Sequence, residues 1–335
     1  MTRAMASFNQ NIENYSMQAF AFVFPGQGSQ SVGMLDAWGD HPVVLEALQE
    51  ASEALGEDVA RLIKDGPKED LALTTNTQPV MLVAGVAAYR AWMAETGAAP
   101  SAVAGHSLGE YSALVAAGVL TLAQAAPLVR FRAQAMQDAV PVGVGAMAAI
   151  LGLDAAKVIE GCAEVANEFA GVADEVVEAV NFNDPLQTVI AGSKDAVDRA
   201  CVVLKAKGAK RALPLPVSAP FHSSLMKPAA IRLRERLQAI EFLPTQIPLI
   251  NNVDVAVELD PDRMRDALYR QAFGPVRWVE CIRALKARGL STVVECGPGK
   301  VLLGTFKRID PELTGIALSD PASLAELKNL FTGAA

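Results

Sequence analysis

The pentapeptide Gly-His-Ser-Leu-Gly at residues 105–109 carries the clearest chemical signature in this chain. It fits the pattern Gly-X-Ser-X-Gly, in which the glycines permit a sharp turn from a strand into a helix and the turn exposes the serine. A short apolar strand, Val103 to Gly105, precedes the serine, and a helix is predicted at 110–117. Ser107 is therefore a candidate nucleophile, and the alternative is an ordinary glycine turn.

A serine nucleophile needs a base, usually a histidine, to remove its proton. This chain has three histidines. His106 adjoins Ser107 in a turn where neighbouring side chains diverge, and His41 precedes Pro42 in a polar stretch typical of a surface or a helix start. His222 follows the end of an apolar strand, where catalytic groups of α/β proteins gather, so elimination favours it as the base. The alternative is a histidine that only satisfies local hydrogen bonds.

A third candidate, Arg132, lies on a helix that we expect to begin at Thr121, because Thr121 and Gln124 have capping-box spacing. Arg132 falls on the shoulder of the apolar face of this helix. One interpretation, which the sequence alone favours, is that its side chain snorkels to water. The other is a partly buried guanidinium that awaits a carboxylate and grips it with two parallel hydrogen bonds. The apolar face consists of Leu122, Ala125, Ala126, Val129, Ala133 and Met136.

The loop Pro-Gly-Gln-Gly-Ser-Gln at residues 25–30 offers backbone N–H groups that could help to form an oxyanion hole. It lacks the lysine of a phosphate-binding loop, and the segment around Lys300 lacks the required spacing and the Ser/Thr, so nucleotide hydrolysis is not expected. We expect Glu110 to be an ordinary carboxylate of the kind favoured in the first turn of a helix.

Alternating strands and helices, typical of the α/β class, must position these residues. Residues 20–24 predict a fully buried strand, and residues 291–302 predict a strand, a glycine turn and a helix in the same body. Between them, about 143–217 has the order β-α-β-β-α-β, which predicts an inserted ferredoxin-like unit. Its predicted strands are 145–151, 175–183, 187–192 and 211–217, and its helices are 154–169 and 194–208.

The composition excludes several classes of protein. With 335 residues, 51% of them hydrophobic, the chain is long enough for a main domain and a smaller one. Its net charge of -8 argues against nucleic acid as the main partner. Four widely spaced cysteines form no Cys-X-X-Cys pair, so neither a zinc site nor a disulfide framework is expected and a reducing cytoplasm fits best.

One uncharged segment, Tyr111 to Val129, has nearly the length of a membrane span. Gly118 interrupts its helical pattern, and the capping box at Thr121 starts a second helix. We therefore expect two buried helices and no membrane anchor.

Nine segments, in order and at matching spacing, resemble the malonyl-CoA:acyl-carrier-protein transacylase family over nearly the whole chain after Met17. The resemblance implies a large α/β-hydrolase-like domain, discontinuous over 19–142 and 218–320, and a ferredoxin-like small domain over 143–217. Residues 1–18 would be an N-terminal extension or a cloning remnant. The nine segments are FVFPGQGSQ, GHSLGEYSAL, the Arg132 segment, GVGAMAAI, NFNDP, QTVIAG, LPLPVSAPFH, RQAFGPVRW and ECGPGKVL.

The resemblance implies a catalytic pair in the groove between the two domains. Ser107 would be the nucleophile, His222 the base and Arg132 the clamp for the malonyl carboxylate. The main-chain carbonyl of Gln271 would orient the histidine in place of a triad aspartate. Ser107 would take the malonyl group from malonyl-CoA and pass it to the phosphopantetheine thiol of acyl carrier protein. No metal or other cofactor is implied, and neither nucleic acid nor a membrane is an expected partner.

Four further positions match the family. Gln27 and Leu108 match residues whose backbone N–H groups form the oxyanion hole, and Asn183 matches a residue that lines the site near the histidine. Leu108 and Phe221 resemble the malonyl-selecting pattern of polyketide acyltransferase domains, whereas methylmalonyl-selecting domains usually have Gln after the serine and Ser before the histidine. Many free-standing fatty-acid enzymes also have Ser before the histidine. Phe221 therefore leaves a polyketide role open, although the rest of the chain favours fatty-acid synthesis.

Two rival functions remain open at this stage. A serine esterase or thioesterase would hand the acyl group to water and should place an Asp or Glu between the serine and the histidine to orient the base, and no motif there indicates a candidate. A carrier-protein docking module would require an incomplete Ser-His pair. Because carrier proteins are typically acidic, two basic clusters are candidate docking surfaces, with an ordinary solvated face as an equally expected alternative. They are Lys205, Lys207, Lys210 and Arg211, or Lys286 and Arg288.

Overall fold

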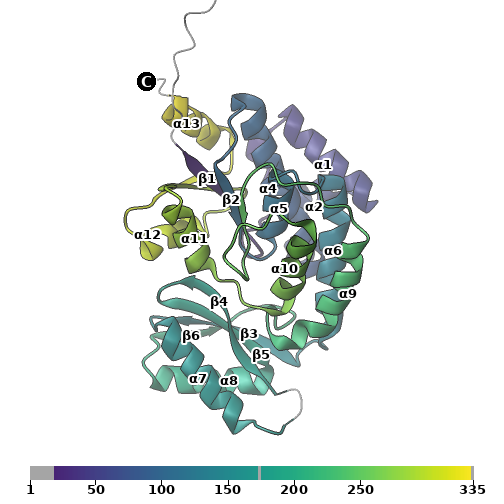
Figure 1. The fold of residues 1–335 in the computed structure, drawn as a ribbon. Helices are drawn as coiled ribbons and strands as arrows, with labels where there is room; N and C mark the ends of the chain where they lie inside the picture. The colour runs from purple at the N-terminus through teal and green to yellow at the C-terminus, as the bar shows by residue number, and fades with distance from the viewer. Residues whose placement is uncertain (1–18, 173–174, 333–335) are drawn as a thin grey trace, which may run out of the picture.

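The computed structural model describes residues 19–172 and 175–332, so the predicted N-terminal extension lies outside the described residues. Figure 1 shows two sheets, a larger helix-flanked assembly above and a smaller one below. The larger assembly holds a five-stranded sheet and the smaller a four-stranded sheet. The protein is thus mixed α/β, with one parallel sheet and a separate antiparallel sheet.

The five-stranded sheet is entirely parallel and has the order β7-β2-β1-β8-β9. Side chains along a strand alternate between the two faces. Phe22 and Phe24 therefore enter one core, and Ala21 and Val23 enter the other. Both faces are buried, as is usual for parallel sheets. The strands are β1 (Phe20–Phe24), β2 (Ala102–Gly105), β7 (Leu249–Ile250), β8 (Thr292–Cys296) and β9 (Thr314–Leu318).

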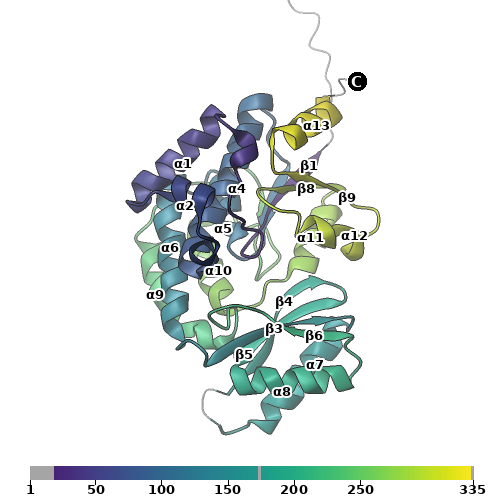
Figure 2. The same ribbon diagram turned by 180° about the vertical axis from the view of Figure 1, so that it is seen from behind.

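Helices cover the two faces of this sheet unequally. The larger core lies under α1 (Pro42–Leu55), α4 (Thr74–Thr96), α5 (Gly109–Ala116), α6 (Leu122–Ala139) and α9 (Lys227–Gln238), and the smaller lies under α11 (Trp278–Ala287) and α12 (Leu303–Ile309). Figure 2 shows this arrangement from behind. The remaining helices here are α2 (Val59–Asp65), α3 (Lys68–Ala72), α10 (Pro261–Phe273) and α13 (Pro321–Thr332).

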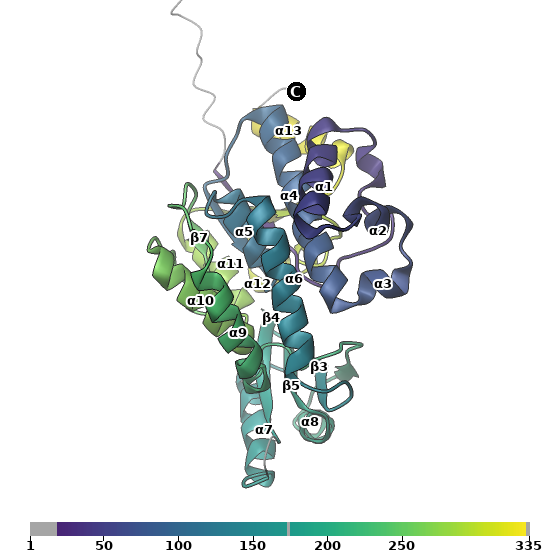
Figure 3. The same ribbon diagram turned by 90° about the vertical axis from the view of Figure 1, so that its right-hand side faces the viewer.

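The uncharged segment forms two helices, as predicted. Thr121 caps α6 by accepting from Gln124 N, and the Gln124 side chain accepts from Thr121 N. Gly118 adopts a φ of 75° in the turn between α5 and α6. Within the described ranges, no helix is long and apolar enough to cross a membrane. In Figure 3, α6 lies between the α1 to α3 group and the adjacent α9 and α10.

The antiparallel sheet has the order β4-β5-β3-β6 and arises from one continuous stretch of chain. Helices α7 (Ala155–Glu168) and α8 (Lys194–Ala206) share a core with one face, while Met147 and Val189 face the larger core. The strands are β3 (Gly145–Leu151), β4 (Val177–Asp184), β5 (Gln187–Ser193) and β6 (Arg211–Pro214).

Strand β6 is shorter than the predicted 211–217. Leu215 N still donates to Met147 O at 2.9 Å, but Pro214 and Pro216 have no N–H with which to extend the ladder.

Two backbone hydrogen bonds join the antiparallel sheet to the larger assembly. Phe182 N donates to Val276 O at 3.0 Å, and Val276 N donates to Val180 O at 2.8 Å. Val276 lies between α10 and α11, so β4 is anchored directly to the segment that follows Gln271.

Candidate active site

The turn from β2 into α5 is the sharp elbow that the glycine pattern predicts. A Cβ atom at Gly105 would lie 1.9 Å from the carbonyl carbon of Gly109, and one at Gly109 would lie 2.1 Å from Phe24 O. Only glycine fits at these two close approaches. Between them, Ser107 adopts a φ of 52°, a left-handed conformation that is rare for residues other than glycine and often marks functional sites.

Ser107 and His222 are hydrogen-bonded although 115 residues separate them, with Ser107 Oγ 2.7 Å from His222 Nε2. His222 Nδ1 lies 2.8 Å from Gln271 O. A carbonyl oxygen can only accept, so Nδ1 carries the proton and Nε2 accepts from the serine. Burial, reinforced by the positive charge of Arg132, lowers the pKa of His222 to about 3. The imidazole is therefore neutral and ready to accept a proton.

Arg132 is buried with a relative exposure of 2%, so the interpretation that it snorkels to water is wrong. Gln78 of α4, Tyr111 of α5 and Gln271 of α10 contact its side chain. Its Nη1 donates to Gln78 Oε1 at 2.7 Å, and its Nη2 donates to Gln271 Oε1 at 3.0 Å and to Ser107 Oγ at 3.3 Å. All three acceptors are neutral oxygens, so a desolvated cation lies beside the serine without a direct carboxylate partner among the described residues.

A cavity of about 130 Å³ opens onto Ser107, His222 and Arg132. Leu108 and Phe221, the two positions that the resemblance connects with substrate choice, contribute apolar walls to it. A second cavity of about 340 Å³ adjoins the first and extends toward Trp278 and Arg308. The residues common to both cavities are Gln27, His106, Asn181 and Leu215.

The other two histidines have different partners. His106 turns away from the serine and lies with Nε2 2.8 Å from Asn183 Oδ1. Asn183 is therefore bonded to His106 rather than to His222. It lines the second cavity. His41 occupies the N-cap of α1, in agreement with a helix start.

Gln27 and Leu108 both line the first cavity. Gln27 borders the cavity, and its side-chain Oε1 accepts from Thr74 Oγ1 at 3.0 Å. Leu108 directly follows the serine at the start of α5. The Ser107 N–H is already engaged, because it donates to Asn252 Oδ1 at 2.8 Å.

Glu110 differs from the ordinary first-turn carboxylate that the sequence suggested. It is 2% exposed, and its Oε2 accepts from Asn252 N at 2.9 Å and from Gln271 Nε2 at 3.1 Å. Burial raises the pKa of this carboxyl to about 7. The signal in the sequence is the nearly uncharged helix around Glu110, since a helix that is apolar on all sides is buried.

Sequence reasoning also missed Gln78 and Asn252. Gln78 holds Arg132 from α4, and Asn252 follows β7, at the carboxyl edge of the parallel sheet. The Asn252 side chain donates to Gly105 O at 2.7 Å and accepts from Ser107 N, so it holds both sides of the elbow. No motif marks either residue, because each acts through contacts distant in sequence.

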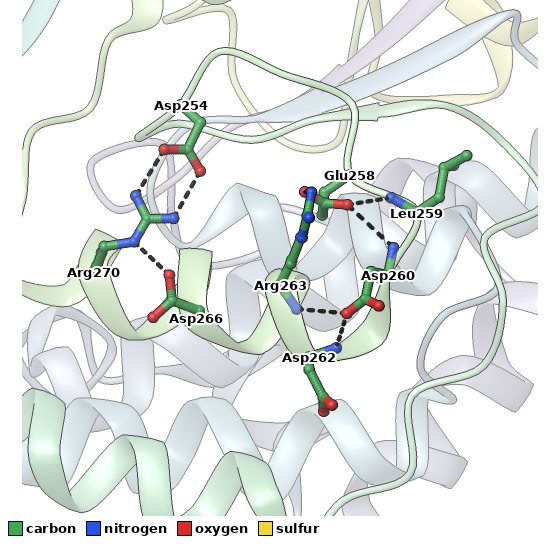
Figure 4. A network of polar contacts seen from close by, with 8 residues as sticks. All are labelled: Asp254, Glu258, Leu259, Asp260, Asp262, Arg263, Asp266 and Arg270. Carbon is green, nitrogen blue, oxygen red and sulfur yellow. Dashed lines mark hydrogen bonds and ion pairs between the residues drawn. The ribbon is translucent and has the colours of Figure 1, made fainter.

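An acidic and basic network on the surface fastens the loop after β7 to α10 (Figure 4). Arg270 donates to both carboxylate oxygens of Asp254 at 2.7 and 2.8 Å, and its Nε donates to Asp266 at 2.6 Å. Asp260 caps the start of α10 by accepting from Asp262 N and Arg263 N. Gln271 follows Arg270 directly in α10 and contacts the elbow through its own side chain, whose Nε2 donates to Ser107 O.

The two candidate docking clusters are partly neutralised by neighbouring acids. Lys207 pairs with Glu160 and Glu164 at 3.0 and 2.8 Å. Lys286 pairs with Asp310 and Glu312 at 2.6 and 2.5 Å. Within residues 19–172 and 175–332, no group of three or more His, Cys, Asp or Glu side chains is arranged to hold a metal ion.

Comparison with known proteins defines the class of this chain. The family described as acyl transferase domain matches residues 21–310, so the protein is an acyltransferase. The malonyl CoA-acyl carrier protein transacylase of Escherichia coli (strain K12) is 53% identical over 310 residues, which cover 92% of this chain and 98% of that protein. This chain belongs to the malonyl-CoA:acyl-carrier-protein transacylase family, in agreement with the resemblance found in its sequence.

Solved structures of malonyl transferases are also similar to this chain. The acyl-carrier-protein S-malonyltransferase from Burkholderia pseudomallei 1710b is 62% identical with a TM-score of 0.90, over 93% of this chain and 100% of that chain. A malonyl-transacylase in complex with a type II PKS acyl-carrier protein is 48% identical with a TM-score of 0.90, over 94% of this chain and 100% of that chain.

Proposed function

We propose that this enzyme transfers the malonyl group of malonyl-CoA to the phosphopantetheine thiol of acyl carrier protein, in fatty-acid synthesis. The observation that carries the proposal is Arg132, a buried cation bonded to neutral oxygens, one of them Ser107 Oγ at 3.3 Å. A carboxylate on the acyl group would give this guanidinium the charged, bidentate partner that it lacks. The relatives described above are named for the same donor, acceptor or both.

The first half-reaction forms a malonyl ester on the protein. Ser107 Oγ attacks the thioester carbon while its proton passes to His222 Nε2. Backbone N–H groups of Gln27 and Leu108 stabilise the oxyanion, and Arg132 holds the malonyl carboxylate. The carbon–sulfur bond then breaks, and the coenzyme A thiolate takes the proton from His222.

The second half-reaction runs the same steps in reverse with a different thiol. The phosphopantetheine thiol gives its proton to His222 Nε2 and attacks the ester carbon, and Ser107 leaves and recovers the proton. The Gln271 main-chain carbonyl orients His222 in both steps through Nδ1. No step changes an oxidation state, so none requires a redox cofactor, and the overall thioester exchange is nearly isoenergetic, so it needs no input of free energy.

The architecture supports a finer description of the fold. The order β3-α7-β4-β5-α8-β6, with strand order β4-β5-β3-β6, favours a ferredoxin-like small domain over 143–217. The elbow at the end of β2 favours an α/β-hydrolase-like large domain over 19–142 and from 218 onward. We place α13 in that domain beyond 320, because Phe331 packs on Phe20 with ring centroids 4.5 Å apart. A cytoplasmic location remains our prediction.

A carrier protein of polyketide synthesis is a second candidate acceptor. Phe221 precedes the histidine where many fatty-acid enzymes have serine, and one structural relative is in complex with a type II PKS acyl-carrier protein. Parallel transfer assays with both kinds of carrier protein distinguish the two acceptors by their specificity constants.

Labelling with radioactive malonyl-CoA in the absence of carrier protein tests the main proposal. We expect rapid labelling that maps to Ser107 and is chased from the enzyme by holo acyl carrier protein. Release of free malonate in the absence of carrier protein, as fast as transfer in its presence, would instead identify a thioesterase.

A further inference from the structure

Gln271 connects every reactive group of the site. Its main-chain oxygen lies 2.8 Å from His222 Nδ1, and its side-chain Oε1 accepts from Arg132 Nη2 at 3.0 Å. Its Nε2 donates to Ser107 O at 3.0 Å and to Glu110 Oε2 at 3.1 Å. The residue has a relative exposure of 0%, so water does not compete for these bonds.

The side-chain amide of Gln271 has one productive orientation. Exchanging its oxygen and nitrogen would point the NH₂ group at the Arg132 guanidinium, which can only donate. The same exchange would point the amide oxygen at Ser107 O and Glu110 Oε2, which face it as acceptors. Arg132 and Glu110, on opposite sides of the amide, therefore select the observed orientation.

Glu110 is itself held rigidly. It lies in the first turn of α5, and the same oxygen that accepts from Gln271 also accepts from Asn252 N at 2.9 Å. The Asn252 side chain is bonded to Gly105 O and Ser107 N on the two sides of the elbow. The position of Glu110 Oε2 relative to Ser107 is thus fixed in two ways, by helix α5, which follows the serine, and by Asn252, which is bonded to both residues.

The Arg270 and Asp254 pair holds the same two chain segments from outside (Figure 4). Exposed ion pairs of this kind contribute little and are screened by salt. Glu110, by contrast, is buried and touches Gln271 directly, so the inner contact determines how Gln271 faces the site.

We propose that Glu110 is a positioning residue for the proposed transfer reaction. Its carboxylate oxygen fixes Gln271 so that the main-chain carbonyl meets His222 and the side-chain oxygen meets Arg132. Glu110 thereby aligns the base and the carboxylate clamp together. The inference rests on the proposed function, but its test can be separated from that function.

Three variants isolate the acceptor oxygen. Glu110→Gln keeps an oxygen where Oε2 accepts both hydrogen bonds, Glu110→Met keeps the length without an acceptor, and Glu110→Asp keeps the carboxyl group but withdraws the oxygen by one methylene group. We expect Glu110→Met to lower the ratio of malonyl-CoA to acetyl-CoA acylation constants roughly tenfold, Glu110→Asp less, and Glu110→Gln at most about threefold.

A second readout does not depend on the acyl group. A fluorophosphonate probe reacts with a serine that its histidine activates, whatever substrate the enzyme prefers. We expect Glu110→Met to slow labelling of Ser107 while Glu110→Gln does not. If the wild-type enzyme has no malonyl preference, the proposed function fails, and the probe still decides the role of Glu110.

Val197→Ala serves as the matched control for lost stability. Val197 lies on α8 and is buried in the core that α7 and α8 share with the antiparallel sheet, away from the site. This variant should lower the thermal midpoint while the acylation ratio and the probe rate per folded enzyme stay unchanged. The proposal is overturned if the soluble Glu110 variants behave like Val197→Ala, or if Glu110→Gln is as impaired as Glu110→Asp. If Glu110→Met does not fold, the Asp and Gln variants still decide the outcome.

Discussion

Arg132 Nη2 lies 3.3 Å from Ser107 Oγ, on the same oxygen that bonds His222 Nε2 at 2.7 Å. One hydroxyl is thus shared by a cation and a neutral base. The positive charge of the guanidinium stabilises negative charge at the serine oxygen. The same charge disfavours a proton on the histidine, since that proton would make the imidazole a second cation. Substrate selection and serine activation are therefore electrostatically coupled.

We expect Arg132→Ala to impair malonyl transfer strongly and to leave acetyl transfer unharmed or improved. Breaking a desolvated charge pair costs about 2 to 5 kcal/mol, a factor of roughly thirty to several thousand. Arg132→Lys should fall between the two, since it keeps the charge without the planar fork. The measurement is the ratio of specificity constants for malonyl-CoA and acetyl-CoA. An unchanged ratio in Arg132→Ala would mean that another group holds the carboxylate.

Ser107→Ala should abolish acyl-enzyme formation, and His222→Ala should slow it severely, because the serine attacks only as its proton is removed. Since the two residues act as a unit, the double variant should lose little more than Ser107→Ala alone. Single-turnover labelling with malonyl-CoA measures acyl-enzyme formation in His222→Ala, and the residual rate of malonyl transfer to carrier protein compares the double variant with each single variant. Independent, multiplicative losses would contradict a coupled pair.

The pKa of His222, about 3, predicts an unusual pH profile. The rate of acylation should show no inflection near 6.5, the ordinary histidine value, and should decline only in more acidic solution. Arg132→Ala removes a charge that lowers this pKa, so its acid limb should move toward neutral pH. Acetyl-CoA is the suitable donor for the comparison, because it does not need the clamp. Identical acid limbs in both proteins would contradict the electrostatic coupling.

The raised pKa of Glu110 predicts that the free energy of unfolding falls as pH rises. Its folded pKa of about 7 exceeds the ordinary 4.5, so the folded state keeps a proton that the unfolded state loses. This stabilisation is complete below pH 4.5 and is lost as pH rises through 7. Between pH 4.5 and the pH above 7 at which Glu110 is ionised, the free energy of unfolding of the wild type should fall by about 3 kcal/mol more than that of Glu110→Gln. Urea unfolding of both proteins at several pH values measures it, and a constant difference would contradict the raised pKa.

Charge reversal tests the docking surface. Lys205, Lys210 and Arg211 are exposed, and Arg288 belongs to the second cluster. Reversing the first three charges should raise the carrier-protein KM and weaken its salt dependence, while the KM for malonyl-CoA changes little. Arg288→Glu tests the second cluster separately. If both leave the carrier-protein KM and its salt dependence unchanged, neither cluster is the docking surface.

The local features of the site could be predicted from the sequence. The five-residue run that becomes β1, the capping box at Thr121 and the elbow glycines act on neighbours in the chain, and the structure contains all three. Local sterics and hydrogen bonds depend on adjacent residues, which the sequence displays in order. Elimination among three histidines also led to His222, which the structure places 2.7 Å from Ser107.

The tertiary structure alone decided the environment of the charged groups. Arg132 lies on the shoulder of its helix by periodicity, yet helices from distant parts of the chain bury it against Gln78 and Gln271, 54 and 139 residues away. Glu110 resembles a solvent-exposed first-turn carboxylate until Asn252 and Gln271 close over it. The desolvation of a charge depends on everything packed around it, and periodicity along one helix reports only which side faces the protein.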